Sequence, residues 1–187
     1  MKAVVSMKSV ALWILFLTGV ALATEAPAYK DGEQWVFRVK STGQADGEYQ
    51  VTYKGGKFDS NDMQFLTSAL FVTVHLADPQ KKWFEFPLVA GKKWSFRYQH
   101  TSAATGRTDW RNSEIEVVGP VPQPVKTSAG EFKVIEVRRT DFFGRARFDL
   151  IYFYSPETKS VVKLVADTDG PGGKTHSEME LTKYSMQ

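Results

Sequence analysis

The chain has 187 residues, of which 42% are hydrophobic, 13% aromatic and 24% charged, and it contains no cysteine. This composition excludes a disordered low-complexity polymer and a small disulfide-stapled protein, so a hydrophobic core must stabilise the fold. The formal net charge of +3 falls to +1 without Lys2 and Lys8 near the N-terminus, which leaves no general basic field for nucleic acid.

Residues 1–23 have the composition of a cleavable signal peptide. Lys2 and Lys8 form a positive n-region, residues 10–21 an apolar h-region, and Ala21-Leu22-Ala23 a small-x-small cleavage site. A membrane anchor is the alternative, but the uncharged run from Ser9 to Thr24 is shorter than the ~18 residues that a spanning helix needs. We therefore expect cleavage before Thr24 and a periplasmic or secreted protein without a stable membrane span.

Residues 24–187 are long enough to bury one core, and we expect a single β-rich domain. The linker-like stretch is residues 119–124, where Pro120, Pro122 and Pro124 alternate and favour an extended course. Because the part of the chain after this stretch would be only marginally stable alone, we interpret it as a stiff connection inside one domain.

Alternation of period two dominates the mature chain and predicts strands. The alternating apolar positions are Trp35, Phe37 and Val39, then Trp94, Phe96 and Tyr98, then Ile115 and Val117, the last pair with Glu114 and Glu116 pointing outwards. The run from Phe65 to Leu76 is ambiguous: it fits either a strand buried on both faces, which its β-branched residues favour, or a short helix.

Two hairpins are predicted in the C-terminal half. One turns at Ser128-Ala129-Gly130, and the other joins residues 148–154 to residues 160–165 across Ser155-Pro156-Glu157-Thr158. The predicted fold class is all-β, with an antiparallel curved sheet that forms a barrel or half-barrel, or folds as a sandwich, and with little helix.

Three motifs carry a resemblance to a known family. They lie at residues 86–94 (FPLVAGKKW), 128–134 (SAGEFKV) and 152–157 (YFYSPE). In this order they resemble a family of uncharacterised exported bacterial β-rich proteins with PL-x-x-GK-x-W, AG-x-F and YYSP motifs. The resemblance implies an architecture similar to the half-barrels of periplasmic lipoprotein carriers, and it implies no chemistry.

Motifs for metal binding and catalysis are weak. The three histidines, His75, His100 and His176, are not spaced as metal ligands, and no cysteine supplements them. Residues 167–178 place acids and glycine at several calcium-loop positions, but Pro171 occupies a ligand position, so a hairpin loop is the preferred interpretation. Without a nucleophile motif either, we expect no metal, no cofactor and no enzymatic activity.

One charged cluster suggests a binding site. Asp141-Phe142-Phe143-Gly144 lies between two arginine pairs, which we interpret as the arms of a hairpin. The six candidate ligand-binding residues are Arg138, Arg139, Phe142, Phe143, Arg145 and Arg147. Four converging guanidinium groups would suit a phosphate or carboxylate, for example a lipid head group, with the two phenylalanines as an apolar tip. The alternative is a solvated strand pair whose arginines are balanced by Glu136, Asp141 and Asp149.

The aromatic residues leave two functions open. A rolled sheet that does not close on its own side chains can hold an apolar ligand, whereas a closed one uses the same rings as core. We expect a non-enzymatic binding or carrier domain for a lipid or other apolar small molecule in the cell envelope. The alternative is an envelope module that binds another protein through an exposed patch.

Overall fold

The computed structural model describes residues 24–43, 45–61, 82–101, 106, 108–170 and 173–187. The predicted signal peptide and the run from Phe65 to Leu76 lie outside these residues. The strands are β1 (Gln34–Ser41), β2 (Gly47–Lys54), β3 (Lys57–Ser60), β4 (Lys93–Thr101), β5 (Thr108–Pro120), β6 (Val125–Thr127), β7 (Gly130–Phe132), β8 (Ile135–Phe143), β9 (Ala146–Ser155), β10 (Ser160–Gly170) and β11 (Gly173–Ser185).

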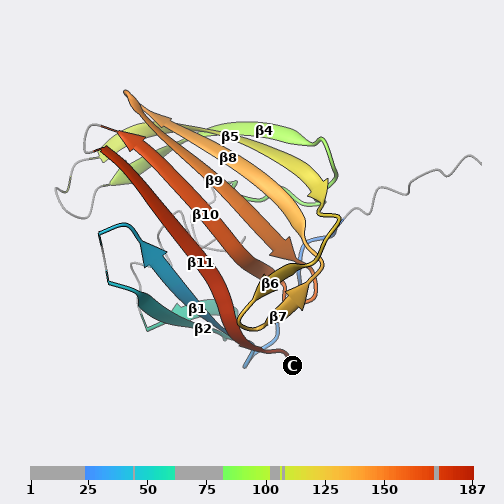
Figure 1. The fold of residues 1–187 in the computed structure, drawn as a ribbon. Helices are drawn as coiled ribbons and strands as arrows, with labels where there is room; N and C mark the ends of the chain where they lie inside the picture. Colours follow the sequence, from blue (N-terminus) through green and yellow to red (C-terminus); the bar gives the residue numbers. More distant parts are fainter. Residues whose placement is uncertain (1–23, 44, 62–81, 102–105, 107, 171–172) are drawn as a thin grey trace, which may run out of the picture.

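The fold is all-β, as predicted. Nine strands form one antiparallel sheet in the order β3-β2-β1-β11-β10-β9-β8-β5-β4, and β6 and β7 form a separate hairpin. The sheet is curved and bends from β4 at the top of Figure 1 to β1 and β2 at the bottom. Most neighbours are consecutive in the chain, so short turns connect them, whereas the β1–β11 and β5–β8 pairs join distant segments.

Period two divides the sheet into two faces. The inner face carries buried residues such as Trp35 and Phe37 of β1 and Ile115 and Val117 of β5. The outer face carries alternating charged residues, including Glu114 and Glu116. The strands predicted from alternation are therefore confirmed.

Aromatic side chains fill the inner face between β4 and β9. Trp83 lies with its ring centroid 4.9 Å from that of Tyr98, and Phe84 lies 5.7 Å from Tyr152. Trp83 and Phe84 precede β4 and are themselves buried, so the segment that carries them covers this part of the sheet. Here the rings form a packed core, which is the filled alternative of the two that the sequence left open.

Both predicted hairpins are confirmed. β6 pairs with β7 through Thr127 and Gly130, and β9 pairs with β10 through Ser155 and Ser160. The calcium-like pattern also lies in a hairpin, because Gly170 at the end of β10 pairs with Gly173 at the start of β11.

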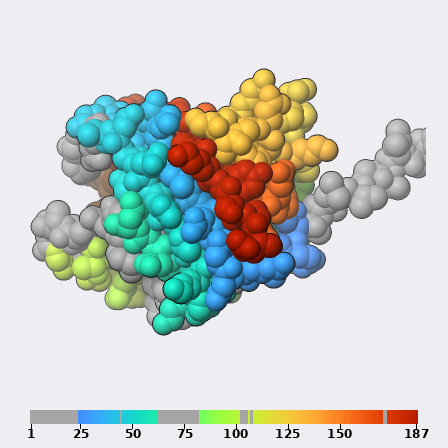
Figure 2. All heavy atoms as spheres, turned by 90° about the horizontal axis from the view of Figure 1, so that it is seen from below, coloured from blue at the N-terminus to red at the C-terminus, as the bar shows by residue number. Residues whose placement is uncertain are grey.

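Contacts outside the main strand ladder tie the β6–β7 hairpin and the segment before β1 to the sheet. The amide of Ala129, in the β6–β7 turn, donates to the carbonyl of Leu181 in β11 at 3.2 Å. Seen from below, the C-terminal residues lie on the surface between the β1–β3 region and the β6–β7 region (Figure 2). At the β9–β10 turn, the ammonium of Lys159 lies 2.6 Å from the buried carboxylate of Glu33, which fixes the segment before β1.

Candidate functional site

The β8–β9 hairpin exists as predicted, but the four arginines do not converge. Arg138 and Arg139 are neighbours on one strand, so they project from opposite faces of the sheet. Arg138 is exposed on the outer face and its Nε lies 2.6 Å from Glu136, whereas Arg139 is buried on the inner face. The expected convergence is therefore wrong, because the alternation that forms the strand also separates its adjacent side chains.

The other four predicted residues do lie together at the end of the hairpin. Phe142 pairs with Arg147 and Phe143 pairs with Ala146, and Arg145 is exposed in the turn between the two strands. Arg147 is bound to its own strand neighbour, since its Nε lies 2.7 Å from Asp149. This end of the sheet lies far from the β6–β7 hairpin, as Figure 1 shows.

Arg139 is the centre of a buried polar group that we call the inner polar cluster, with members Tyr98, Ser113, Arg139, Asp141 and Tyr152. Its Nε lies 3.1 Å from the Ser113 hydroxyl and 2.7 Å from the Asp141 carboxylate. Its terminal nitrogens donate to Tyr152 at 3.2 Å, to Tyr98 at 3.0 Å and to the second oxygen of Asp141.

Further contacts hold the inner polar cluster together. The Tyr98 hydroxyl donates to Asp141 at 2.7 Å, and the Arg139 guanidinium stacks 3.6 Å above the ring of Trp83. Burial raises the pKa values of Tyr98 and Tyr152, so both phenols stay protonated; the Tyr98 hydroxyl donates to Asp141, and the Tyr152 hydroxyl accepts from Arg139. A buried charge needs such partners, and the cluster accounts for Arg139 as a structural residue. A role for Arg139 in ligand binding stays a prediction.

Arg111 differs from Arg139 in having no such partners. It projects from β5 onto the inner face, beside the inner polar cluster and towards the end of the sheet. Its guanidinium lies 5.0 Å from the ring centroid of Phe148 and 5.5 Å from that of Phe143. Within the part of the chain that the structure describes, its buried Nε has no hydrogen-bond acceptor. We call Arg111, Phe143 and Phe148 the inner rim.

Arg111 was not among the residues predicted from the sequence, although a signal was present. Arg111 lies an even number of positions before Ile115 and Val117 in the sequence, so the two-residue period of a strand places it on the same apolar face. A cation on an otherwise apolar face is unusual enough to mark a candidate site. The phenylalanines beside it come from β8 and β9, and that juxtaposition requires the sheet order.

The outer face of the same end carries a second group, which we call the outer rim: Arg97, Trp110, Phe142 and Arg145. Trp110 is 49% exposed and Phe142 is 37% exposed, and Arg97 stacks 4.7 Å above the Trp110 ring. No ion pair joins Arg97 or Arg145 to a carboxylate among residues 24–187 that the structure describes. Both rims therefore combine arginine with aromatic rings.

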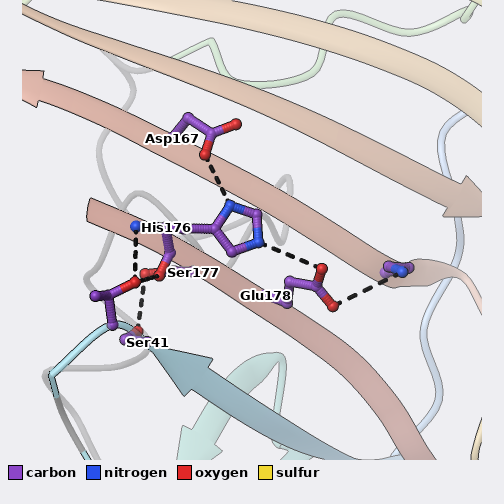
Figure 3. Close-up of polar contacts among 7 residues, drawn as sticks. Ser41, Asp167, His176, Ser177 and Glu178 are labelled. Atoms are coloured by element: carbon purple, nitrogen blue, oxygen red, sulfur yellow. Dashed lines mark hydrogen bonds and ion pairs between the residues drawn. The ribbon is translucent and has the colours of Figure 1, made fainter. Parts of the chain in front are cut away.

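His176 forms a separate polar group on the outer face (Figure 3). Its Nδ1 lies 2.7 Å from Asp167 of β10 and its Nε2 lies 3.3 Å from Glu178 of β11. Hydrogen bonds to these two carboxylates raise its pKa, so the charged form is favoured. Because both ring nitrogens already face carboxylates, the arrangement is an ion-pair clamp between two strands. In the described residues, no three acidic or histidine side chains are grouped so that they could hold a metal ion.

Several grooves lie on the described surface, and two of them differ clearly in their lining. The larger, about 540 Å³, lies on the outer face of β4, β5 and β8 and is lined by charged residues, among them Lys93 and Glu116, which pair at 3.2 Å. The other, about 290 Å³, lies at the opposite end from the rims and is mostly apolar. Its lining includes Pro120, Pro122, Pro124 and Pro156. Among the described residues there is no helix long and apolar enough to cross a bilayer.

Comparisons with known proteins give little further information. No protein-family model matches the chain, so the family suggested by the three motifs stays a prediction, while its β-rich architecture is confirmed. No curated protein matches either. One solved structure is similar to this chain: an exported protein, as its description has it, with a YmcC-like fold from Bacteroides fragilis NCTC 9343. The similarity covers 87% of this chain and 99% of that chain, with 12% sequence identity and a TM-score of 0.39. A likeness of that size carries no argument about this chain.

Proposed function

We propose that this protein is an exported, non-enzymatic binding domain whose ligand is an anionic amphiphile, meaning an apolar chain that ends in a phosphate or carboxylate. The observation that carries the proposal is Arg111, a partly buried guanidinium between two phenylalanine rings that has no carboxylate partner in the described chain. The signal-peptide pattern of residues 1–23 supports export to the periplasm or the exterior.

Arg111 is a partly buried cation whose Nε has no hydrogen-bond acceptor among the described residues. A guanidinium that is partly removed from water normally acquires an anionic or hydrogen-bonding partner, because an unsatisfied buried donor costs about 1–3 kcal/mol. Arginine binds phosphate and carboxylate through two parallel hydrogen bonds. Phe143 and Phe148 flank it on the same face, so they can contact the apolar chain of a molecule whose head group Arg111 holds.

The inner polar cluster favours this assignment. Arg139 is already bound by Asp141, Ser113 and two tyrosines, so it does not need an anionic ligand as a partner. The packed rings next to the inner rim leave no room for an apolar chain between them, so the proposed ligand would lie against the end of the sheet.

Calorimetric titration with dodecyl phosphate, and with the uncharged dodecyl maltoside as a matched amphiphile, tests the proposal. We expect the native protein to bind dodecyl phosphate more tightly, and Arg111→Gln to weaken that binding by about tenfold or more, since a charge-assisted hydrogen bond is lost. Arg138→Gln is the matched control, because Arg138 is exposed on the other face and paired with Glu136.

Equal weakening by Arg111→Gln and Arg138→Gln, or equal binding of the two amphiphiles, would contradict the proposal. Near-ultraviolet circular dichroism of each variant shows whether the fold is retained. Arg111→Lys serves as a second variant: it keeps the charge but loses the planar fork, so intermediate binding is expected.

A second candidate function is supported by the proline-lined groove at the other end of the sheet. An apolar groove on an exported domain suits an extended segment of another envelope protein. Substituting Val121→Ser within this groove would impair that function and leave dodecyl phosphate binding unchanged, so the two functions are separable.

A further inference from the structure

The outer rim has a composition that the proposed ligand does not explain. Trp110 and Phe142 are two of the three large hydrophobic residues that are most exposed in the described chain. Both lie on the outer face at the same end, since Phe142 pairs with Asn112, two residues from Trp110 on β5. The third such residue, Val118, lies further along β5 towards the other end of the sheet.

Cations surround these two rings. Arg97 stacks on Trp110, Arg145 occupies the β8–β9 turn, and neither has an ion-pair partner within the described residues. Acids also lie near this end: Asp149 is engaged by Arg147, Asp169 lies 3.7 Å from Lys174, and Asp109 precedes Trp110 in the chain. Among the described residues, none of them forms an ion pair with Arg97 or Arg145, so the outer rim keeps two arginines without an ion-pair partner beside two exposed rings.

We propose that the outer rim docks this protein on the surface of a lipid bilayer that carries anionic head groups. Tryptophan and phenylalanine insert at the boundary between head groups and acyl chains, and each arginine near an anionic bilayer contributes about 1 kcal/mol of attraction. Charge complementarity favours an anionic bilayer as the partner, because the exposed aromatic rings lie beside arginines that have no ion-pair partner among the described residues.

The small number of exposed rings favours a bilayer over a protein partner. A stable protein interface covers about 800 Å² on each partner, whereas the exposed rings here are two side chains at the tip of strand pairs. A bilayer needs only a few inserted groups and a basic surface. The inner rim lies on the other face of the same strands, so docking at the outer rim leaves Arg111 accessible.

Sedimentation with vesicles tests the docking. The purified protein is mixed with vesicles of phosphatidylcholine alone or of phosphatidylcholine and phosphatidylglycerol in equal parts, and the bound fraction is measured. We expect binding to the anionic vesicles only, with an approximately tenfold weaker partition coefficient for the double variant Arg97→Gln, Arg145→Gln at low salt. Trp110→Ala should weaken it by about as much.

Matched controls separate this surface from general electrostatics. Lys126→Gln with Lys133→Gln removes two exposed charges near the opposite end, and Val118→Ala removes an exposed apolar side chain outside the rim; both should leave the partition coefficient unchanged. Bromine-labelled acyl chains should quench the fluorescence of the native protein much more than that of Trp110→Ala, because Trp35 and Trp83 are buried. The half-buried Trp94 lies near the start of β4, at the end of that strand away from the outer rim.

The outcomes are decisive and separate from those of the ligand proposal. Equal binding to both vesicle types, or equal loss from the control variants and the rim variants, would overturn the docking. Arg111→Gln should sediment as the native protein does. Loss of sedimentation in Arg111→Gln with none in the rim variants would overturn the docking and place the lipid contact at the inner rim.

Discussion

Arg111 and Arg139 show how neighbouring inner-face positions give one residue type two different roles. Arg139 is 1% exposed and is held by a carboxylate, a serine and two tyrosines. Arg111 lies beside the same cluster with aromatic neighbours and an unsatisfied Nε. Burial alone therefore does not decide function, and the number of engaged guanidinium nitrogens separates a structural arginine from a candidate ligand-binding one.

The buried pair predicts a strongly non-additive response to substitution. Arg139→Met alone leaves Asp141 charged and unpaired in the core and should lower the free energy of unfolding by about 3–5 kcal/mol. The double variant Arg139→Met, Asp141→Leu removes both charges and should be more stable than the single variant. Urea denaturation measures both values, and additive losses would show that the pair is not coupled.

At the scale of strands, β10 and β11 are held by side chains as well as by their backbone ladder. Asp167 and His176 are direct cross-strand partners, and Lys163 of β10 reaches Glu178 of β11 at 3.8 Å. This clamp lies on the outer face, where the His176 side chain is half exposed. Its contribution must therefore depend on salt and on the charge of His176.

The clamp predicts a pH dependence with a definite sign. The folded pKa of His176 is raised by Asp167 and Glu178, so the folded state binds the proton more tightly than the unfolded state. Its stabilisation should be complete below about pH 6 and should disappear as the pH rises through the folded pKa. Urea titrations of the native protein and of His176→Gln should differ more in acid than at about pH 9.

Two observations check this prediction further. In Asp167→Asn the pKa of His176, followed by NMR, should move back towards its ordinary value, because the first of its carboxylate partners is neutralised. A difference between native protein and His176→Gln that grows with pH would have the opposite sign and would contradict the clamp.

For the whole molecule, buried phenols predict sensitivity to alkali. Burial raises the pKa values of Tyr29, Tyr98, Tyr152 and Tyr154 above the ordinary value of 10.0. Above that value the unfolded chain loses these protons while the folded protein keeps them, so the free energy of unfolding should fall as the pH rises. Phenolate absorbance should appear together with unfolding; ionisation of all tyrosines in a still folded protein near pH 10 would be inconsistent with this packing.

Local pattern predicted much of this architecture. Alternation at residues such as Trp35 and Ile115 identified strands and their buried face, and turn residues identified the β6–β7 and β9–β10 hairpins. The β1–β11 and β5–β8 pairings depend on contacts between distant segments, which period and turn chemistry do not encode.

The candidate site was predictable in part. Phe142, Phe143, Arg145 and Arg147 were placed correctly at a hairpin end, whereas the expected convergence with Arg138 and Arg139 ignored the opposite faces of adjacent strand residues. The sequence did indicate that Arg111 lies on the same strand face as the apolar Ile115, because the two residues are four positions apart. That it lies between Phe143 and Phe148 follows only from the order of β5, β8 and β9.

The most direct test of the central claim is an NMR titration that follows the Nε–Hε signals of the arginines while dodecyl phosphate is added to the native protein. The account predicts that the Arg111 signal moves with saturation, together with the ring signals of Phe143 and Phe148, while the buried Arg139 signal stays in place. Saturable binding that moves residues of the proline-lined groove and leaves Arg111 unchanged would contradict it.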